Sequence, residues 1–212
     1  MRKFAIGLAL LAATTATAAN ASTTISMGGP SSPGVNWGNT HVFSSGGLTI
    51  TAKGFTASNV ATALYGKNGG GDEIGLGLAN DPSGDNEIYY GYGYVQLDVS
   101  ALFGLISGMS FMTNSTTDGE KWSVYGSNVS GSYSGSALIS GTNESSAWLP
   151  SFGSYKYYDF VSTSTSGGKN FLISSVTMVP VPEPSTWAMM LLGFAGIGMS
   201  LRKRRNVLAQ VA

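Results

Sequence analysis

The sequence predicts an all-β protein whose main domain is a β-sandwich over residues 22–179, jelly-roll-like in its connections. Within these bounds, apolar, β-branched or aromatic runs alternate with clusters of Gly, Asn, Ser and Asp, which is typical of short strands joined by turns. Helical periodicity is weak over the same residues, and no propeller or solenoid repeat is present. The chain has no cysteine, so an exported domain of this size would depend on its apolar core for stability.

The N-terminus, residues 1–21, has the order of a secretory signal peptide. Arg2 and Lys3 form a positively charged n-region, a short apolar run follows it, and small residues then form a cleavage site. The small-x-small rule predicts cleavage between Ala21 and Ser22, and Ala16-Thr17-Ala18 is a competing site. The apolar run is too short to span a bilayer comfortably, which favours a cleaved signal over an anchor.

Seven strand-like runs stand out in the middle of the chain: GLTITAKGF, EIYYGYGYVQLDV, GMSFMT, KWSVYGS, SALIS, YKYYDFVS and NFLISSVTMV. In the first run, Leu48, Ile50 and Ala52 alternate with Thr and Lys, as expected for a half-buried strand. The second run predicts one strand that carries four residues on one face: Ile88, Tyr90, Tyr92 and Tyr94. With the turns between them, these runs predict eight or nine strands in all.

Three tryptophans lie in this domain, and two of them have more than one interpretation. Trp122 belongs to a strand pattern and is expected in the core. Trp148, beside a proline, and Trp37, in a Gly/Pro-rich segment, are expected in loops. There they either cap the end of the sandwich, which we favour for Trp148, or serve as stacking platforms for a sugar ring. The tyrosine run at Tyr89, Tyr90, Tyr92 and Tyr94 is either a binding stripe or a strand with one half-exposed face, and the second interpretation is favoured.

The formal net charge of zero hides an uneven distribution of charge. Six of the eleven basic residues lie at the two ends of the chain, so the middle keeps five lysines against ten acidic residues and has no arginine. A protein that binds nucleic acid needs a basic surface. The composition therefore excludes a nucleic-acid partner.

No catalytic constellation is recognisable, and we expect that the protein is not an enzyme. The only histidine, His41, lies in a Gly/Asn-rich segment and is expected to be a surface or hydrogen-bonded residue. No zinc-protease, nucleophile-elbow or phosphate-loop motif is present, and the acids show no positioned pair of the kind that glycosidases use.

The stretch GDEIGLGLANDPSGDNE concentrates half of the acids of the middle. Calcium prefers carboxylate, amide and backbone oxygens, which would make four residues candidate ligands: Asp72, Asp81, Asp85 and Glu87. The spacing does not match an EF-hand loop. The other interpretation, which we favour, is a solvated acidic turn between two strands.

The end of the chain reads VPEPSTWAMMLLGFAGIGMSLRKRR and has three parts of unlike chemistry. Residues 180–186 form a Pro-rich linker that is expected to be extended, with Ser185 or Thr186 capping a helix over residues 187–201. That helix has no charged residue, which predicts a single transmembrane segment. Its fifteen residues cover about 22 Å, against about 30 Å of hydrocarbon, so it would need a thinned bilayer and the interfacial Trp187.

Residues 202–212 are expected to be a cytoplasmic tail. Its basic residues would set the topology with the sandwich on the opposite side of the membrane: Arg202, Lys203, Arg204 and Arg205.

This tail resembles the PEP-CTERM protein-sorting signal of Gram-negative bacteria. The resemblance covers about an eighth of the chain and implies that Pro182, Glu183 and Pro184 are the recognition motif of an exosortase, a transpeptidase-like membrane enzyme associated with exopolysaccharide synthesis. It further implies a precursor that the inner membrane holds transiently, and a mature form that stays at the cell surface or is secreted. The order of GGGDEIGLGLANDPSGDNEI, WSVYGSN and NFLISSVT also resembles the extracellular sandwich of many such proteins, which implies a surface or matrix role.

Three functions follow as hypotheses, in decreasing order of preference. The first is an exported, non-enzymatic protein of the cell envelope or of the exopolysaccharide matrix. The second is a carbohydrate-binding module on the same scaffold, with an extracellular polysaccharide as partner. The third is a secreted hydrolase, which the missing constellation disfavours.

Overall fold

The computed structural model describes residues 22–116, 119–165, 170–181 and 184–208. The chain divides into two compact units. One is Ser22–Pro180, and the other consists of the chain ends Met1–Ala21 and Val181–Ala212.

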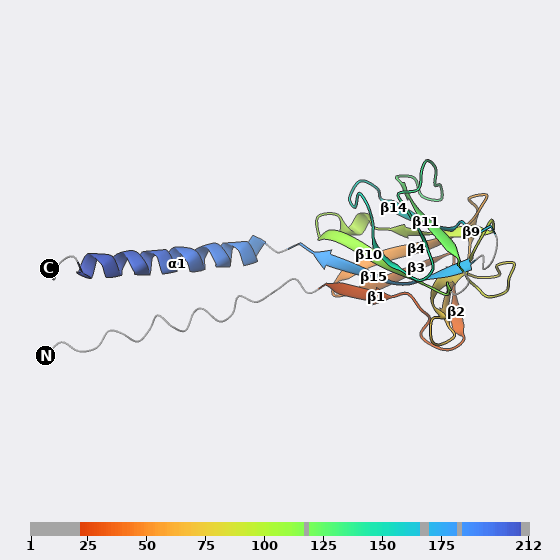
Figure 1. The fold of residues 1–212 in the computed structure, drawn as a ribbon, viewed down its shortest axis with the longest axis horizontal. Coiled ribbons are helices and arrows are strands. Elements are labelled where there is room, and N and C mark those ends of the chain that lie inside the picture. Colours follow the sequence, from red (N-terminus) through yellow and green to blue (C-terminus); the bar gives the residue numbers. More distant parts are fainter. Residues whose placement is uncertain (1–21, 117–118, 166–169, 182–183, 209–212) are drawn as a thin grey trace. The chain divides into compact units, whose positions relative to one another are not determined.

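The unit Ser22–Pro180 is a sandwich of two β-sheets, which confirms the all-β prediction (Figure 1). In the first sheet the strand order is β13-β10-β15-β7-β6-β2, and β1 and β8 also pair with β15. Its strands are β1 (Thr23–Ser26), β2 (Gly34–Gly38), β6 (Leu64–Asn68), β7 (Ile74–Leu78), β8 (Ile88–Tyr89), β10 (Ile106–Asn114), β13 (Ser146–Trp148) and β15 (Asn170–Pro180). Figure 1 shows β1, β10 and β15 side by side, in agreement with their antiparallel pairing.

The second sheet has the order β12-β11-β14-β9-β4-β3, and β5 pairs with β4 at its end. Its strands are β3 (Thr40–Ser45), β4 (Leu48–Thr56), β5 (Ala61–Thr62), β9 (Gly93–Asp98), β11 (Lys121–Ser127), β12 (Ile139–Thr142) and β14 (Tyr157–Ser162). A 3-10 turn, η1 (Ser100–Leu102), follows β9. The jelly-roll-like connection pattern stays a prediction.

The strands follow the expected alternation of buried and exposed side chains. In β4, Leu48, Ile50 and Ala52 are buried, and the residues between them are not. Alternation of this kind directs one face of the strand to the core. In β15 the phase changes near Ser174, where the register with β10 shifts between Met112 and Thr113, as at a β-bulge.

The two sheets meet through an aromatic core. Phe111 of β10 contacts Trp122 of β11 and Phe160 of β14 edge to face, with ring centroids 5.2 Å and 4.9 Å apart. All three side chains are buried, and edge-to-face pairs of this kind stabilise beyond the area they bury. The prediction that Trp122 lies in the core is confirmed.

The structure corrects the strand expected over EIYYGYGYVQLDV. Gly91 has φ +73°, a conformation that favours glycine, and the chain turns there between β8 and β9. Tyr90 is consequently an exposed turn residue, whereas Tyr94 is fully buried. The expected eight or nine strands are too few, because several observed strands are short and polar and have no apolar run.

In the other unit, the described residues form one helix, α1 (Pro184–Leu208). It begins three residues before the expected start at Trp187, so Ser185 and Thr186 lie inside it rather than capping it. Within the described ranges, no helix is long and apolar enough to count as a membrane span. The expectation of a transmembrane helix over residues 187–201 is therefore not confirmed.

Candidate functional site

The predicted sorting segment follows directly after β15. That strand ends at Pro180, so the first residue of the expected linker belongs to the sandwich. Pro182 and Glu183 lie outside the described residues, and Pro184 is the first residue of α1. Proline suits this position, because the first helical residue has no intrahelical use for its N–H.

The basic cluster continues the helix instead of beginning a separate tail. Arg202 is exposed, and Lys203, Arg204 and Arg205 lie within α1, which ends at Leu208. Arg and Lys are good helix formers, and their charge is favourable near a helix C-terminus, so the helix extends further than the apolar run.

The other end of the chain is placed only from Ser22 onward. The expected signal peptide, including Ala21, lies outside the described residues. Ser22 is exposed, and β1 begins at the next residue, so the predicted mature N-terminus coincides with the edge of the folded unit.

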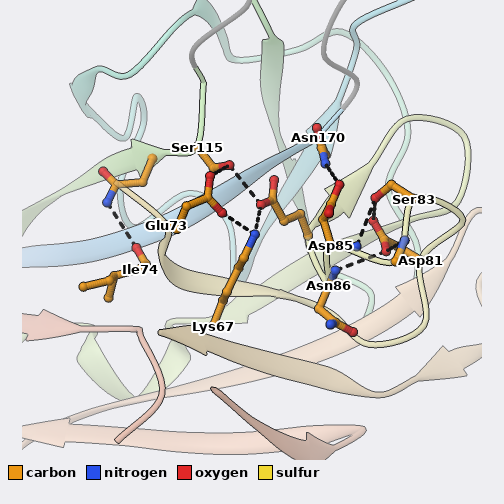
Figure 2. Close-up of polar contacts among 12 residues, drawn as sticks. Lys67, Glu73, Ile74, Asp81, Ser83, Asp85, Asn86, Ser115 and Asn170 are labelled. Carbon is orange, nitrogen blue, oxygen red and sulfur yellow. Dashed lines mark hydrogen bonds and ion pairs between the residues drawn. The ribbon is translucent and has the colours of Figure 1, made fainter. Parts of the chain in front are cut away.

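The acidic stretch is dispersed by the fold, and Asp81 is used within its own turn. Its Oδ1 accepts hydrogen bonds from the backbone N–H groups of Gly84 and Asn86 at 2.9 Å and 3.2 Å, and its Oδ2 accepts from Ser83 Oγ at 2.6 Å (Figure 2). This is the pattern of an acidic side chain that closes a turn. The turn part of the interpretation fits Asp81, but the side chain is buried and not solvated.

Glycines in β7 allow that turn to pack on the sheet. A Cβ at Gly77 would lie 2.3 Å from the backbone oxygen of Asn86, which no side chain tolerates. The segment before β8 therefore approaches the backbone of β7 directly. This close approach places Glu87 beside β6 and β7.

Glu87 belongs to a charge cluster that the sequence does not reveal, in which Glu87 is buried and the Glu73 side chain is 37% exposed. The ammonium of Lys67, on β6, forms ion pairs with both Glu73 and Glu87 (Figure 2). The hydroxyl of Ser115 lies 2.7 Å from Glu73 Oε1 and 2.9 Å from Glu87 Oε1, so it donates to one carboxylate at a time. Ser115 has φ +57°, and its backbone N–H donates to the carbonyl oxygen of Asp72 at 3.1 Å.

The two carboxyls of this cluster differ in their affinity for protons. Burial raises the pKa of Glu87 to about 7, against the hydrogen bonds from Lys67 and Ser115. Burial also acts to raise the pKa of Glu73, but hydrogen bonds from the same two residues outweigh it and lower the pKa. The pKa of Lys67 is raised, because its hydrogen bonds to the two carboxylates outweigh its own burial. One lysine thus holds one carboxylate ionised, and Glu87 is the group that retains a proton near neutral pH.

The structure does not assemble the expected calcium ligands. Asp72 is exposed, Asp85 is exposed and accepts from Asn170 Nδ2 at 3.3 Å, and Asp81 and Glu87 have the partners given above. Among the described residues, no three His, Asp or Glu side chains are grouped so that they could hold a metal ion.

Lys67 and Ser115 were missed from the sequence for a physical reason. They lie 20 and 28 positions from Glu87, and only the pairing of strands brings them together. A lone lysine in a segment with few charges was the single available signal.

The candidate stacking residues have different surroundings. Trp37 lies on β2, not in a loop, and stacks on His41 with ring centroids 4.0 Å apart and planes at 8°. Burial lowers the pKa of His41, which is a packing residue rather than a free surface residue. Trp148 lies on β13, at the edge of the first sheet, and remains 59% exposed, so it does not cap the sandwich.

Comparison with known proteins identifies the tail. The model of the PEP-CTERM protein-sorting motif matches residues 180–205, which implies an exported protein that an exosortase processes from a membrane-anchored precursor. No curated protein matches the sequence. Two solved structures show a likeness, both of variants of CBM29-2, a family 29 carbohydrate-binding module, at 15% and 14% identity. Each covers 74% of this chain and 91% of its own, with TM-scores of 0.32 and 0.31, which are too low to support an inference.

Proposed function

We propose that the protein is an exported, non-enzymatic component of the cell envelope or of the exopolysaccharide matrix, which an exosortase processes at its C-terminal tail. The observation that carries the proposal is the match of the sorting motif to residues 180–205. Residues 180–205 contain the last residue of β15, the residues that follow it, and the apolar and basic parts of α1.

The structure of the unit Ser22–Pro180 supports the proposal that the tail can be removed without loss of the sandwich. The core lies within Ser22–Pro180, and β15, which pairs with four other strands, ends one residue before Val181. Removal of the tail near Pro182–Pro184 would leave every strand of the sandwich in place. The mature domain would then need neither chain end for its fold.

The helix α1 supports a transient association of the precursor with the inner membrane. Its described apolar side chains are 39–69% exposed: Trp187, Met189, Met190, Leu191, Leu192, Phe194, Ile197 and Met199. Exposed apolar surface of this extent favours an apolar environment over water. We therefore place α1 at the membrane until an exosortase removes it, and the mature form at the cell surface or outside the cell.

The test is a Glu183→Ala substitution in the full chain, expressed in a host that carries its exosortase. The wild-type chain should lose its tail and leave the membrane fraction, whereas the variant should accumulate there at full length. Glu144→Ala, which changes an exposed acid of the sandwich, is the matched control and should be processed normally. The proposal fails if wild type and Glu183→Ala have the same size and the same distribution between fractions.

A further inference from the structure

The outer face of the second sheet carries a row of polar and aromatic side chains. Four residues lie opposite one another on neighbouring strands β11, β14, β9 and β4: Tyr125, Asp159, Gln96 and Lys53. Their chain neighbours Val124, Phe160 and Val95 are buried in the core between the sheets. Because successive residues of a strand point to opposite faces, the row lies on the face that the first sheet does not cover.

Gln96 joins this row to the loop over residues 128–138, which connects β11 to β12. Its Nε2 donates to Asp159 Oδ1 at 2.7 Å. Its Oε1 accepts from Ser130 Oγ at 3.0 Å and from the backbone N–H of Gly131 at 3.1 Å. The loop is therefore held over Asp159 by contacts to this amide group. Lys53, which donates to Ser130 Oγ, and Asn128, which donates to the backbone oxygen of Ser154, also hold it.

The same loop inserts an aromatic ring between two others. The ring of Tyr133 lies 4.8 Å from that of Tyr94 and 4.9 Å from that of Tyr125. Asp159 contributes to raising the pKa of Tyr133, after burial and the neighbouring Tyr125, so the phenol and the carboxyl are near one another. The loop thus places a flat ring with a hydroxyl group on the aromatic side of the row.

Asp159 itself is not satisfied by these contacts. It is fully buried, and its Oδ2 has no hydrogen-bond partner among the described residues. The nearest lysine of the row, Lys53, has Asp98 as its ion-pair partner at 3.9 Å and donates to Ser130 Oγ at 3.2 Å. A buried acceptor without a partner is costly and is a common mark of a ligand site.

We propose that the outer face of the second sheet, beneath the loop 128–138, binds a neutral polysaccharide. A sugar ring takes the place of the Tyr133 ring against Tyr125, and one of its hydroxyl groups forms a hydrogen bond with Asp159 Oδ2. Lys53 and Gln96 supply further partners for sugar hydroxyls beside it. The inference rests on the proposed function, because a matrix protein meets such polymers after export.

The chemistry of the face favours this occupant. An aromatic ring next to a carboxyl group with an unpaired oxygen suits a ligand that has apolar C–H faces and hydroxyl groups. The middle of the chain has five lysines against ten acids, which opposes a polyanionic polymer. The loop can open because a ligand can replace the few polar contacts that hold it.

The two tryptophans do not form a comparable site. Trp37 has one face on His41, and its ring lies where a Cβ of Gly66 would be, so it is packed within the sandwich. Trp148 is exposed and lies against Gly108, and the described residues around it include no buried polar group without a partner. It is the rival site in the test.

The test is affinity electrophoresis of the full chain in a detergent without sugar groups, in gels that contain a neutral galactomannan, a neutral β-glucan or alginate. We expect retardation by at least one neutral polymer and none by alginate. Tyr125→Ala and Asp159→Asn should weaken this binding about tenfold or more, whereas Tyr125→Phe keeps the ring and should stay within about twofold. Tyr133→Ala should strengthen binding, because the ligand no longer has to displace the ring.

Tyr90→Ala, which removes an exposed tyrosine from a turn elsewhere, is the matched control and should bind as wild type does. Circular dichroism shows whether each variant folds. If Asp159→Asn does not fold, the comparison of Tyr125→Ala with Tyr125→Phe still decides the test. The inference is overturned if no neutral polymer retards the chain, if only alginate does, or if Trp148→Ala abolishes binding and Tyr125→Ala does not. Normal processing of a chain that fails to bind refutes this site alone, whereas failed processing of a chain that binds refutes the proposed function alone.

Discussion

Glu87 and Asp159 are buried carboxyls in two different regions of the sandwich, and their hydrogen-bond and ion-pair partners differ. Each has one oxygen without a hydrogen-bond partner among the described residues. Burial raises the pKa of each to about 7, against Lys67 and Ser115 for Glu87 and against Gln96 for Asp159. Glu87 has a lysine beside it, whereas Asp159 accepts a hydrogen bond from the neutral amide of Gln96.

This difference separates a structural cluster from a candidate binding site. Lys67, Glu73 and Glu87 tie β6, the start of β7 and the segment before β8 to one another, and the ammonium occupies the space between the carboxylates (Figure 2). Asp159 instead faces a loop that can be replaced by a ligand. The carboxyl of the first region is therefore paired with a cation, whereas the carboxyl of the second region is not.

The largest effect of a single substitution is expected from Lys67→Met. The substitution leaves the buried Glu87 and the partly exposed Glu73 without a cation, so the free energy of unfolding should fall by about 3 kcal/mol at pH 8. Denaturant titration of the full chain, followed by tryptophan fluorescence, measures it. Lys121→Met, at an exposed position on β11, is the control and should change stability by less than about 0.5 kcal/mol. Equal losses in both variants would mean that the cluster does not stabilise the fold.

The pH profile tests both regions together. Glu87 and Asp159 keep their protons up to about pH 7 in the folded state, whereas in the unfolded chain they lose them near their ordinary pKa values of 4.5 and 3.8. The folded state then binds more protons than the unfolded state, so stability should fall as pH rises from about 4 to 7, on the order of 3 kcal/mol for each group.

The matched variant for this profile is Glu87→Gln/Asp159→Asn, which removes both titrations. Denaturant titrations at pH 4, 5.5, 7 and 8 should give a flatter profile for it than for wild type. A wild-type profile that rises through this range would show that neither carboxyl has a raised pKa.

The smallest effect is expected from Gln96→Leu. The change removes the donor to Asp159 and the acceptor for the loop 128–138, with a loss of about 2 kcal/mol in the free energy of unfolding. Thermal unfolding at fixed pH measures it against Ser44→Ala on β3, which should be neutral. No difference between the two would mean that the loop is not held through Gln96.

The sequence predicts the regular part of the fold well. β4, β11 and β14 match their apolar runs, because alternation is a local property that strand formation preserves. Strands such as β2 and β13 were not predicted, since they are short, have no alternating apolar run and exist through pairing with a neighbour. The strand expected over residues 87–99 is interrupted at Gly91. The positive φ of this glycine forms a turn in spite of the alternating pattern around it.

The candidate site was less predictable. Asp81 and Glu87 were candidates for one calcium site, beside the favoured interpretation as an acidic turn. In the structure, Asp81 closes its own turn and Glu87 pairs with Lys67 on β6. For Asp159, the alternation in YKYYDFVS places it on the face opposite Phe160, yet not beside Gln96. That contact depends on which strands neighbour β14, which no local pattern encodes.

The sorting motif was recognised from the sequence because it depends on the order of three kinds of residue and not on folding. Its match to residues 180–205 confirms that recognition. The length of α1 was not predicted, since the basic residues continue the helix to Leu208.

The intact mass of the mature protein, purified from a host that carries its exosortase, tests the central claim most directly. The account predicts a chain that begins near Ser22 and ends near Pro182–Pro184, and therefore lacks the basic residues 202–205. A mature protein whose mass still includes residues 185–212 would contradict it.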